Sequence, residues 1–253
     1  MSIAFILPHA SLPGNTAAAP AAEPPPPARE IFLDWHPVWH FNMMVIIFIG
    51  FDRMEAKLTR KEASHRRIVE AAARAIRRGG YGGVGVADIM KEAGLTHGGF
   101  YAHFPSRDAM LAEALEYAGQ DASEAAARRA DQLRRKGASP FRALVETYLS
   151  DAHCKSLEAG CPVAALVSDM PRQSPQLREA SSHRVRDLLG AVQRALPAAV
   201  APGESAVIAS TLVGALQLAR ALGEGEQRQA LLAANRAALI SQYDIPGDAI
   251  ATQ

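Results

Sequence analysis

The chain has 253 residues, a length that suits one large domain or two small ones and that allows a substantial core. Lys and Arg number 27 against 26 Asp and Glu, which excludes both an acidic solvating chain and a histone-like polycation. Two cysteines are too few for a disulfide scaffold or a four-cysteine zinc site, and no metal or cofactor is predicted. Hydrophobic residues make up 49% and aromatic residues only 6%, which predicts a mostly helical, soluble protein of a reducing compartment, the cytoplasm.

Residues 1–53 differ from the rest of the chain. Ala17–Pro27 is an Ala/Pro tract ending in four consecutive prolines, which is typical of extended or disordered chain. A short apolar run at residues 43–49 ends near Asp52 and is far shorter than the roughly 20 apolar residues that span a bilayer. We expect a disordered extension, and three interpretations stay open: a stretch upstream of the natural start, a tail, or an anchor. Met54 is a plausible alternative start.

Residues 54–105 predict three helices, the last two forming a helix-turn-helix at about 85–104. The first helix has an apolar face and ends at Gly79-Gly80; the face is made by Ile68, Val69, Ala72, Ala73 and Ile76. Gly94 is placed for a left-handed C-cap of the second helix. No β-strand is predicted anywhere in the chain.

The third helix is predicted from Thr96 as N-cap to His103 or Phe104, with Phe100 and Phe104 facing inward four residues apart. Pro105 prevents its continuation, and Ser106 is expected to cap the next helix. Gly98-Gly99 is unfavourable in a helix interior by roughly 1 kcal/mol per glycine relative to alanine. Two such glycines indicate that something approaches this face closely, and a DNA groove is one such partner.

Local charge favours the same partner. Residues 54–107 carry ten Lys and Arg against five Asp and Glu, whereas the whole chain is nearly neutral. A module that faces phosphates needs this asymmetry. Hydroxyl and imidazole groups that can reach phosphates and base edges surround the two glycines, namely Thr96, His97, Tyr101 and His103.

A family resemblance is carried by Ile68–Ala72, Val86-Ala87-Asp88-Ile89, Ala93-Gly94-Leu95-Thr96, and Gly99-Phe100-Tyr101-Ala102-His103-Phe104 followed by Arg107. These stretches resemble the N-terminal domain of TetR/AcrR-type transcriptional regulators, and the stretch from Val213 through Arg220 resembles a helix near their C-terminus. The resemblance implies an all-α homodimeric repressor. Its helix-turn-helix domain would span residues 54–105, and its effector-binding and dimerisation domain residues 106–253. Its two recognition helices would enter successive major grooves of a palindromic operator.

The resemblance also implies roles for single residues. Thr96 and Tyr101 would contact phosphate, His97, Gly98 and His103 would approach bases or backbone, and Ser64 stands where the family often has a phosphate-contacting threonine. The chain departs from the family in one place, because Pro105 occupies a position that is commonly Lys. Arg107 is a possible substitute for that phosphate contact.

The C-terminal part predicts further helices, one of which is apolar nearly all round. A helix of that kind, at residues 204–222, must be covered on every side, so we expect it to face the core on one side and a second subunit on the other. A helix at residues 227–242 is its expected partner. The predicted dimer interface is represented by Leu212, Leu216, Leu231 and Leu239. The segment 106–135 predicts one long helix or two joined near Gly119.

Few residues suggest a sensing chemistry. Cys154 and Cys161 flank a loop beside His153, and an imidazole neighbour can activate a thiol, although inert core cysteines are more common. Tyr148 and Met170 are further candidates for lining an effector cavity. Together with these residues, the family resemblance implies a non-enzymatic, ligand-responsive DNA-binding regulator that binds operator DNA, a second copy and an unknown effector, but no membrane. A cysteine-based redox or electrophile sensor and a dimeric interaction protein without DNA binding remain alternatives.

Overall fold

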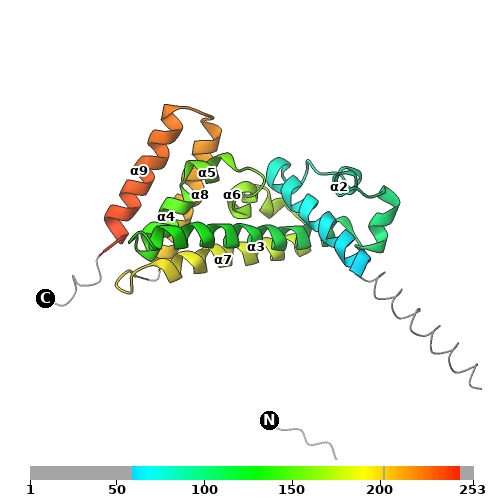
Figure 1. The fold of residues 1–253 in the computed structure, drawn as a ribbon, viewed down its shortest axis with the longest axis horizontal. Coiled ribbons are helices and arrows are strands. Elements are labelled where there is room, and N and C mark those ends of the chain that lie inside the picture. The colour runs from blue at the N-terminus through cyan, green and yellow to red at the C-terminus, as the bar shows by residue number, and fades with distance from the viewer. Residues whose placement is uncertain (1–58, 202, 246–253) are drawn as a thin grey trace, which may run out of the picture. The chain divides into compact units, whose positions relative to one another are not determined.

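A computed structural model describes residues 59–201 and 203–245, so the predicted extension over residues 1–53 lies outside the described part. Every regular element in the described part is a helix, which confirms the all-helical prediction (Figure 1). Residues 59–79 are helical and are called the leading helix. We call residues 59–105 the head and the described residues from 106 onward the body.

The head continues with α2 (Val86–Glu92) and a 3-10 helix, η1 (His97–Ala102). The body begins with the long helix α3 (Arg107–Arg134). Its other helices are α4 (Pro140–Tyr148), α5 (Asp151–Lys155), α6 (Pro162–Leu166), η2 (Met170–Arg172), α7 (Pro175–Ala195), α8 (Glu204–Ala221) and α9 (Glu226–Tyr243). No helix within residues 59–201 and 203–245 is long and apolar enough to cross a membrane.

Serine side chains start four of the body helices. Each accepts a hydrogen bond from the backbone N–H three residues further on, and the four are Ser106, Ser139, Ser150 and Ser174. This bond satisfies one of the N–H groups that a helix leaves free at its N-terminus. The predicted cap at Ser106 is thereby confirmed. α3 runs unbroken through Gly119, so the segment forms one helix and not two, and it lies beside α7 (Figure 1).

Left-handed glycines end the helices of the head where the sequence predicts them. Gly80 has φ 72° after the leading helix, and Gly94 has φ 69° after α2. The N–H of Leu95 returns to the carbonyl of Met90 at 2.8 Å, which satisfies one of the last carbonyls of α2. A side chain at either glycine would strain its turn, so Gly80 shapes the turn between the leading helix and α2, and Gly94 shapes the turn between α2 and η1.

Two hydrophobic cores hold the described residues together. The first core joins the leading helix, α2, η1 and the first half of α3, and it is closed by Leu166, Met170 and Leu177 from α6, η2 and α7. The second core joins α4, α5, α8 and α9 with Ala164 of α6 and Val192 of α7. The short helix α6 therefore contributes to both cores, and the head shares its core with the body.

Candidate nucleic-acid interface

Two phenylalanines fasten the recognition segment, residues 96–104, onto the head. Phe100 and Phe104 are each only 2% exposed, and their rings stack with centroids 5.8 Å apart. Ile89 and Met90 of α2 are buried beneath them in the same core. The predicted inward orientation of both phenylalanines is confirmed, and the other side of the segment is left for solvent or a partner.

The recognition segment is a 3-10 helix and not the α-helix that the sequence predicts. The N–H of Gly99 donates to the carbonyl of Thr96 at 3.1 Å, and that of His103 to the carbonyl of Phe100 at 2.9 Å. Thr96 occupies the N-cap position, yet its side chain makes no capping bond there. Two adjacent glycines within six residues weaken α-helical propagation, and short segments commonly adopt the tighter helix instead.

Four of the predicted DNA-contacting residues form the outer surface of this segment. Thr96, His97, Gly98 and Tyr101 are all exposed, and Tyr101 reaches 75% exposure although it follows the buried Phe100. A β-carbon placed on Gly98 would meet no atom within 4 Å. The fold itself therefore does not require glycine at this position, and the bare backbone leaves room for a close external partner.

His103 is turned toward the leading helix and is half-buried. Its ring lies 5.8 Å from that of His65, which in turn stacks on Phe104 at 4.4 Å. His65 Nε2 lies 2.6 Å from a carboxylate oxygen of Glu113 on α3. Burial lowers the pKa of His103, and the nearby His65 and Lys61 lower it further. This environment favours the neutral imidazole of His103.

Arg107 is used inside the protein. Its guanidinium donates to the backbone carbonyls of Tyr81 and Val84 in the turn after the leading helix. The side chain thus closes the turn between the leading helix and α2. A phosphate contact by Arg107 would require these internal hydrogen bonds to be exchanged.

Arg67 is a candidate that the sequence analysis did not single out. Its Nη2 donates to the Ser64 hydroxyl at 3.4 Å, and its Nη1 lies 3.8 Å from the place of a β-carbon on Gly94. An exposed cation therefore lies beside the turn that leads into the recognition segment, next to the half-buried Ser64. The three-residue spacing from Ser64 on one helix face is the pattern that predicts this proximity.

The predicted sensing residues of the body do not come together as one group. Tyr148, Cys154 and Cys161 pack in or against the second core, whereas Met170 belongs to the first core. Burial raises the pKa of the Tyr148 hydroxyl well above its usual value, and the neighbouring Cys161 adds to the shift. No hydrogen bond of good geometry reaches this buried hydroxyl from the described residues.

His153 is a structural clamp and not a base for a thiol. Its Nδ1 lies 2.7 Å from the carbonyl of Tyr148, and its Nε2 accepts the N–H of Cys161 at 3.0 Å. Burial lowers the pKa of His153, which keeps the ring neutral as this pair of bonds requires. Because backbone groups occupy both ring nitrogens, the predicted activation of a cysteine by this imidazole has no geometric basis.

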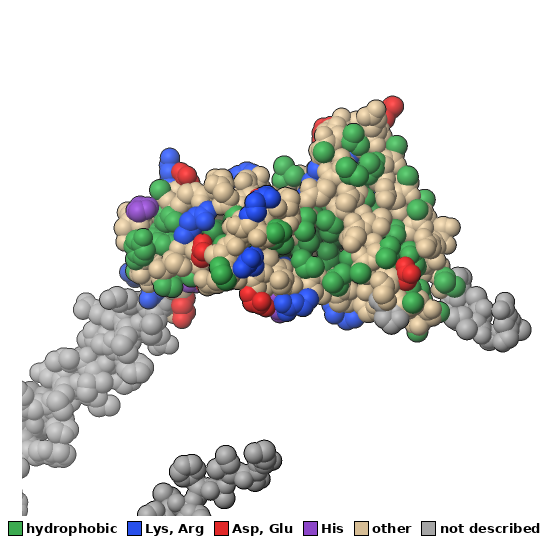
Figure 2. Space-filling model, turned by 180° about the vertical axis from the view of Figure 1, so that it is seen from behind, with side chains coloured by type: hydrophobic (Ala, Val, Ile, Leu, Met, Phe, Trp, Pro, Cys, Tyr) green, Lys and Arg blue, Asp and Glu red, His purple; other side chains and the backbone are tan. Residues whose placement is uncertain are grey.

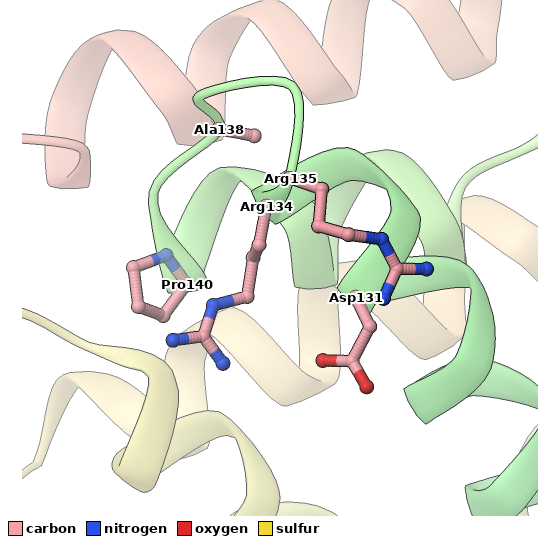
Figure 3. Close-up of a pocket in the computed structure, with 5 residues that line it drawn as sticks. All are labelled: Asp131, Arg134, Arg135, Ala138 and Pro140. Carbon is pink, nitrogen blue, oxygen red and sulfur yellow. The ribbon is translucent and has the colours of Figure 1, made fainter.

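Two surface hollows lie between helices of the body. One, of about 440 Å³, lies at the turn from α3 to α4, where Arg134 points toward Pro140 and Arg135 toward Asp131 (Figure 3). The other, of about 320 Å³, includes Leu133 and Arg236. Neither is lined by the predicted effector residues Tyr148, Cys154, Cys161 and Met170.

Most of the leucines predicted for the dimer interface lie inside a single chain. Leu212 and Leu216 are fully buried and Leu239 is 5% exposed within a single chain, so their side chains fill the second core. Leu231 is half-buried. The large exposed apolar side chains here are instead Val207 and Leu218 of α8 and Leu222, which directly follows the last residue of α8. In the region of α8 and α9, Figure 2 shows mostly hydrophobic and uncharged atoms, whereas Lys and Arg gather toward the head.

Comparisons with known proteins agree with this arrangement. Residues 68–114 match the family model described as "Bacterial regulatory proteins, tetR family", and residues 137–238 match "Tetracyclin repressor-like, C-terminal domain". The "HTH-type transcriptional regulator LmrA" of Bacillus subtilis is 28% identical over 158 residues, covering 60% of this chain and 81% of the relative.

Solved structures share the fold. A TetR-family regulator from Chloroflexus aurantiacus superposes with a TM-score of 0.59 at 24% identity, covering 73% of this chain and 97% of its own. Another from Agrobacterium tumefaciens gives 0.57 at 19% identity, covering 72% and 98%. The two family models together match more than half of the chain, the first over most of the head and the start of α3, and the second over the body. The chain therefore belongs to the TetR family of non-enzymatic, DNA-binding transcriptional regulators.

Proposed function

We propose that this regulator binds a palindromic operator as a homodimer, represses transcription there, and is released by a small-molecule effector. The observation that carries the proposal is the exposed apolar face of α8. Val207, Leu218 and Leu222 are 55%, 60% and 46% exposed, and their spacing places them on one side of the helix. An apolar face of this kind on a soluble regulator supports contact with a second protein surface.

The neighbouring helix α9 extends this face with small side chains. Its exposed alanines recur on one side at residues 230, 233, 234, 237 and 238. Alanines allow two helices to approach closely, and a two-fold axis brings the same face of each copy together. We therefore propose a four-helix interface in which α8 and α9 of one copy pack on α8 and α9 of the other, with Leu218 near its centre.

The head supplies the proposed DNA contacts. Thr96 and Tyr101 are assigned to phosphates, His97 to a base edge, and Gly98 to the close approach of the backbone to the groove. Arg67 and Ser64 are assigned to a phosphate beside the turn at Gly94. His103 is assigned to the support of the recognition segment from the leading helix, a change from its expected contact with bases. A two-fold axis would set the two segments about 34–36 Å apart, one turn of DNA.

The effector part of the proposal rests on Tyr148. A buried hydroxyl without a good hydrogen-bond partner costs about 1–3 kcal/mol, which a ligand that bonds to it would recover. The half-buried Cys161 lies beside this hydroxyl, and Arg220 is close enough to affect its pKa. We assign the effector contact to Tyr148 and Cys161, and we leave Cys154 in the core because it is only 3% exposed.

Selection of DNA fragments that the purified protein retains, followed by gel shift, tests the proposal. A bound fragment should contain an inverted repeat, and its affinity should fall as salt rises because phosphate contacts release counterions. Thr96→Ala and Tyr101→Ala should weaken binding to all sequences alike, whereas His97→Ala should change the preference at one or two base pairs. Unaltered affinity in all three folded variants would remove residues 96–104 as the reading surface.

A further inference from the structure

An arginine at the end of the leading helix joins the head to a loop of the body. Arg78 Nη1 donates to Glu158 at 2.7 Å, and its Nη2 lies 3.5 Å from a carboxylate oxygen of Glu92. Glu158 belongs to the loop 156–161 between α5 and α6, and Glu92 is the last residue of α2. Arg74 also holds Glu92, through two N–H groups at 2.9 and 3.1 Å.

The loop 156–161 is firmly attached to the body on its other side. The His153 ring connects the carbonyl of Tyr148 with the N–H of Cys161, as described above. Arg220 of α8 donates to the carbonyls of His153, Cys154 and Ser156 at 3.2–3.3 Å. A β-carbon on Gly160 would come within 2.8 Å of the carbonyl of Ser156, so the loop is tightly folded. Glu158 is therefore carried by a loop whose two ends are attached to the body.

The contacts of Arg78 are better suited to orienting the segments that carry Glu92 and Glu158 than to stabilising the folded chain. Its side chain is 51% exposed, and those of Glu158 and Glu92 are 45% and 31% exposed. Ion pairs of this exposure add little to folding stability. The planar guanidinium nevertheless holds two carboxylates at fixed angles, which a flexible ammonium does not. Its bond to Glu158 raises the pKa of Arg78 and lowers that of Glu158, so both groups stay charged near neutral pH.

We propose that Arg78 is a positioning residue for DNA recognition, through which the loop 156–161 of the body sets the orientation of α2. α2 has seven residues, and only two of its side chains are buried. It leads through Gly94 directly into the recognition segment, so a tilt of α2 moves Thr96 and His97. Operator affinity then depends on where the body holds Glu158, and any movement of that loop next to Tyr148 and Cys161 reaches the head through this arginine.

The test compares Glu158→Gln, Arg78→Gln and the double variant of the full chain with wild type. Arg186→Gln is the matched control, because Arg186 is an exposed arginine that pairs with Glu179 inside α7. Operator affinity, affinity for an unrelated duplex, Tm and hydrogen exchange of the α2 amides are measured at one salt concentration. Glu158→Gln removes a negative charge, so its electrostatic effect alone tightens DNA binding. A weaker complex consequently reports lost positioning and not altered charge.

We expect Glu158→Gln to weaken operator binding about three- to tenfold and to speed exchange in α2, with Tm and the control variant unchanged. In the Arg78→Gln background, Glu158→Gln should have no further effect, because the two changes break one chain of contacts. Operator binding by Glu158→Gln that equals or exceeds wild type, or effects that simply add in the double variant, would overturn the role of Arg78. The inference rests on the proposed operator binding, which fails separately if wild type itself does not distinguish the selected operator from the unrelated duplex.

Discussion

The guanidinium of Arg184 on α7 lies against the backbone of Gly119 in the middle of α3. A β-carbon on Gly119 would collide with Arg184 Nη1 and would come within 2.8 Å of its Cδ. The buried arginine reaches across α3 to Glu116 at 2.8 Å and is held on α7 by Asp187 at 2.7 Å. The glycine thus allows a charged side chain to pass between two packed helices and reach its partners.

Gly119→Ala should therefore lower the free energy of unfolding although alanine is the better helix former. The new methyl group must displace Arg184 from its two carboxylates, and overpacking of this kind costs about 1–3 kcal/mol. Urea unfolding followed by circular dichroism measures the change. Gly79→Ala is the control, because a β-carbon there meets nothing within 4 Å, and it should leave stability unchanged or raise it. Equal stability of Gly119→Ala and wild type would show that Arg184 moves aside freely.

Gly98→Ala separates folding from DNA binding. A β-carbon at this position meets no atom of the protein, so Tm should stay the same or rise slightly. Operator binding should nevertheless weaken by about tenfold, equal to 1.4 kcal/mol, because the methyl group enters the space assigned to DNA. Gel shift and thermal melting on the same preparation check both parts. A variant that binds as tightly as wild type would move the DNA away from Gly98.

Arginine substitutions on α8 distinguish its two faces. Leu218→Arg places a charge on the exposed apolar face, so the chain should fold normally but dissociate into monomers and lose tight operator binding. Leu212→Arg instead buries an unpaired charge in the second core, which should cost about 4 kcal/mol or more and unfold the chain. Light scattering and circular dichroism report the two outcomes. A Leu218→Arg variant that stays dimeric would place the interface on another surface.

Stability should fall as the pH is lowered from about 7.5 to about 5.5. Burial lowers the folded-state pKa of His103 and of His153 below the ordinary value of 6.5. The unfolded chain then takes up protons first, so the stability that is present above pH 6.5 is lost as the pH falls from that value through the lower folded-state pKa values. His153→Gln should melt lower at neutral pH but show a smaller loss on acidification than wild type. A pH-independent Tm in wild type would contradict this.

The sequence predicted the head better than the body because its determinants are local. The glycines at 80 and 94 and the phenylalanines at 100 and 104 act through neighbours a few residues away, and the structure confirms all four. The α-helical and 3-10 forms of so short a segment differ little in free energy, and the spacing of its apolar residues does not distinguish them. The internal use of Arg107 depends on the carbonyls of a turn more than twenty residues earlier, which no local pattern reveals.

The body shows where periodicity carries no information. α8 is apolar nearly all round, so its sequence does not tell the buried Leu212 from the exposed Leu218. Local sequence offers Gly119 as a helix break because glycine is a poor helix former. The arginine that requires a glycine there lies 65 residues further along the chain, so no local pattern reveals it. The sequence offers Tyr148 and Met170 together as cavity-lining candidates, but the turn between α6 and α7 places Met170 in the first core and Tyr148 packs against the second.

Because the head and the body share the first core, the head cannot be separated from this body or exchanged for another without loss of packing. Met110, Leu111 and Leu115 of α3, together with Leu166 and Leu177, cover apolar side chains of the head. A head cut away after Pro105 would expose that surface to water, and a head grafted from another regulator would meet side chains shaped for this one. The DNA-reading part of this protein is therefore not a portable module, and its operator preference is free to diverge only through its outward residues or together with its supports in the body.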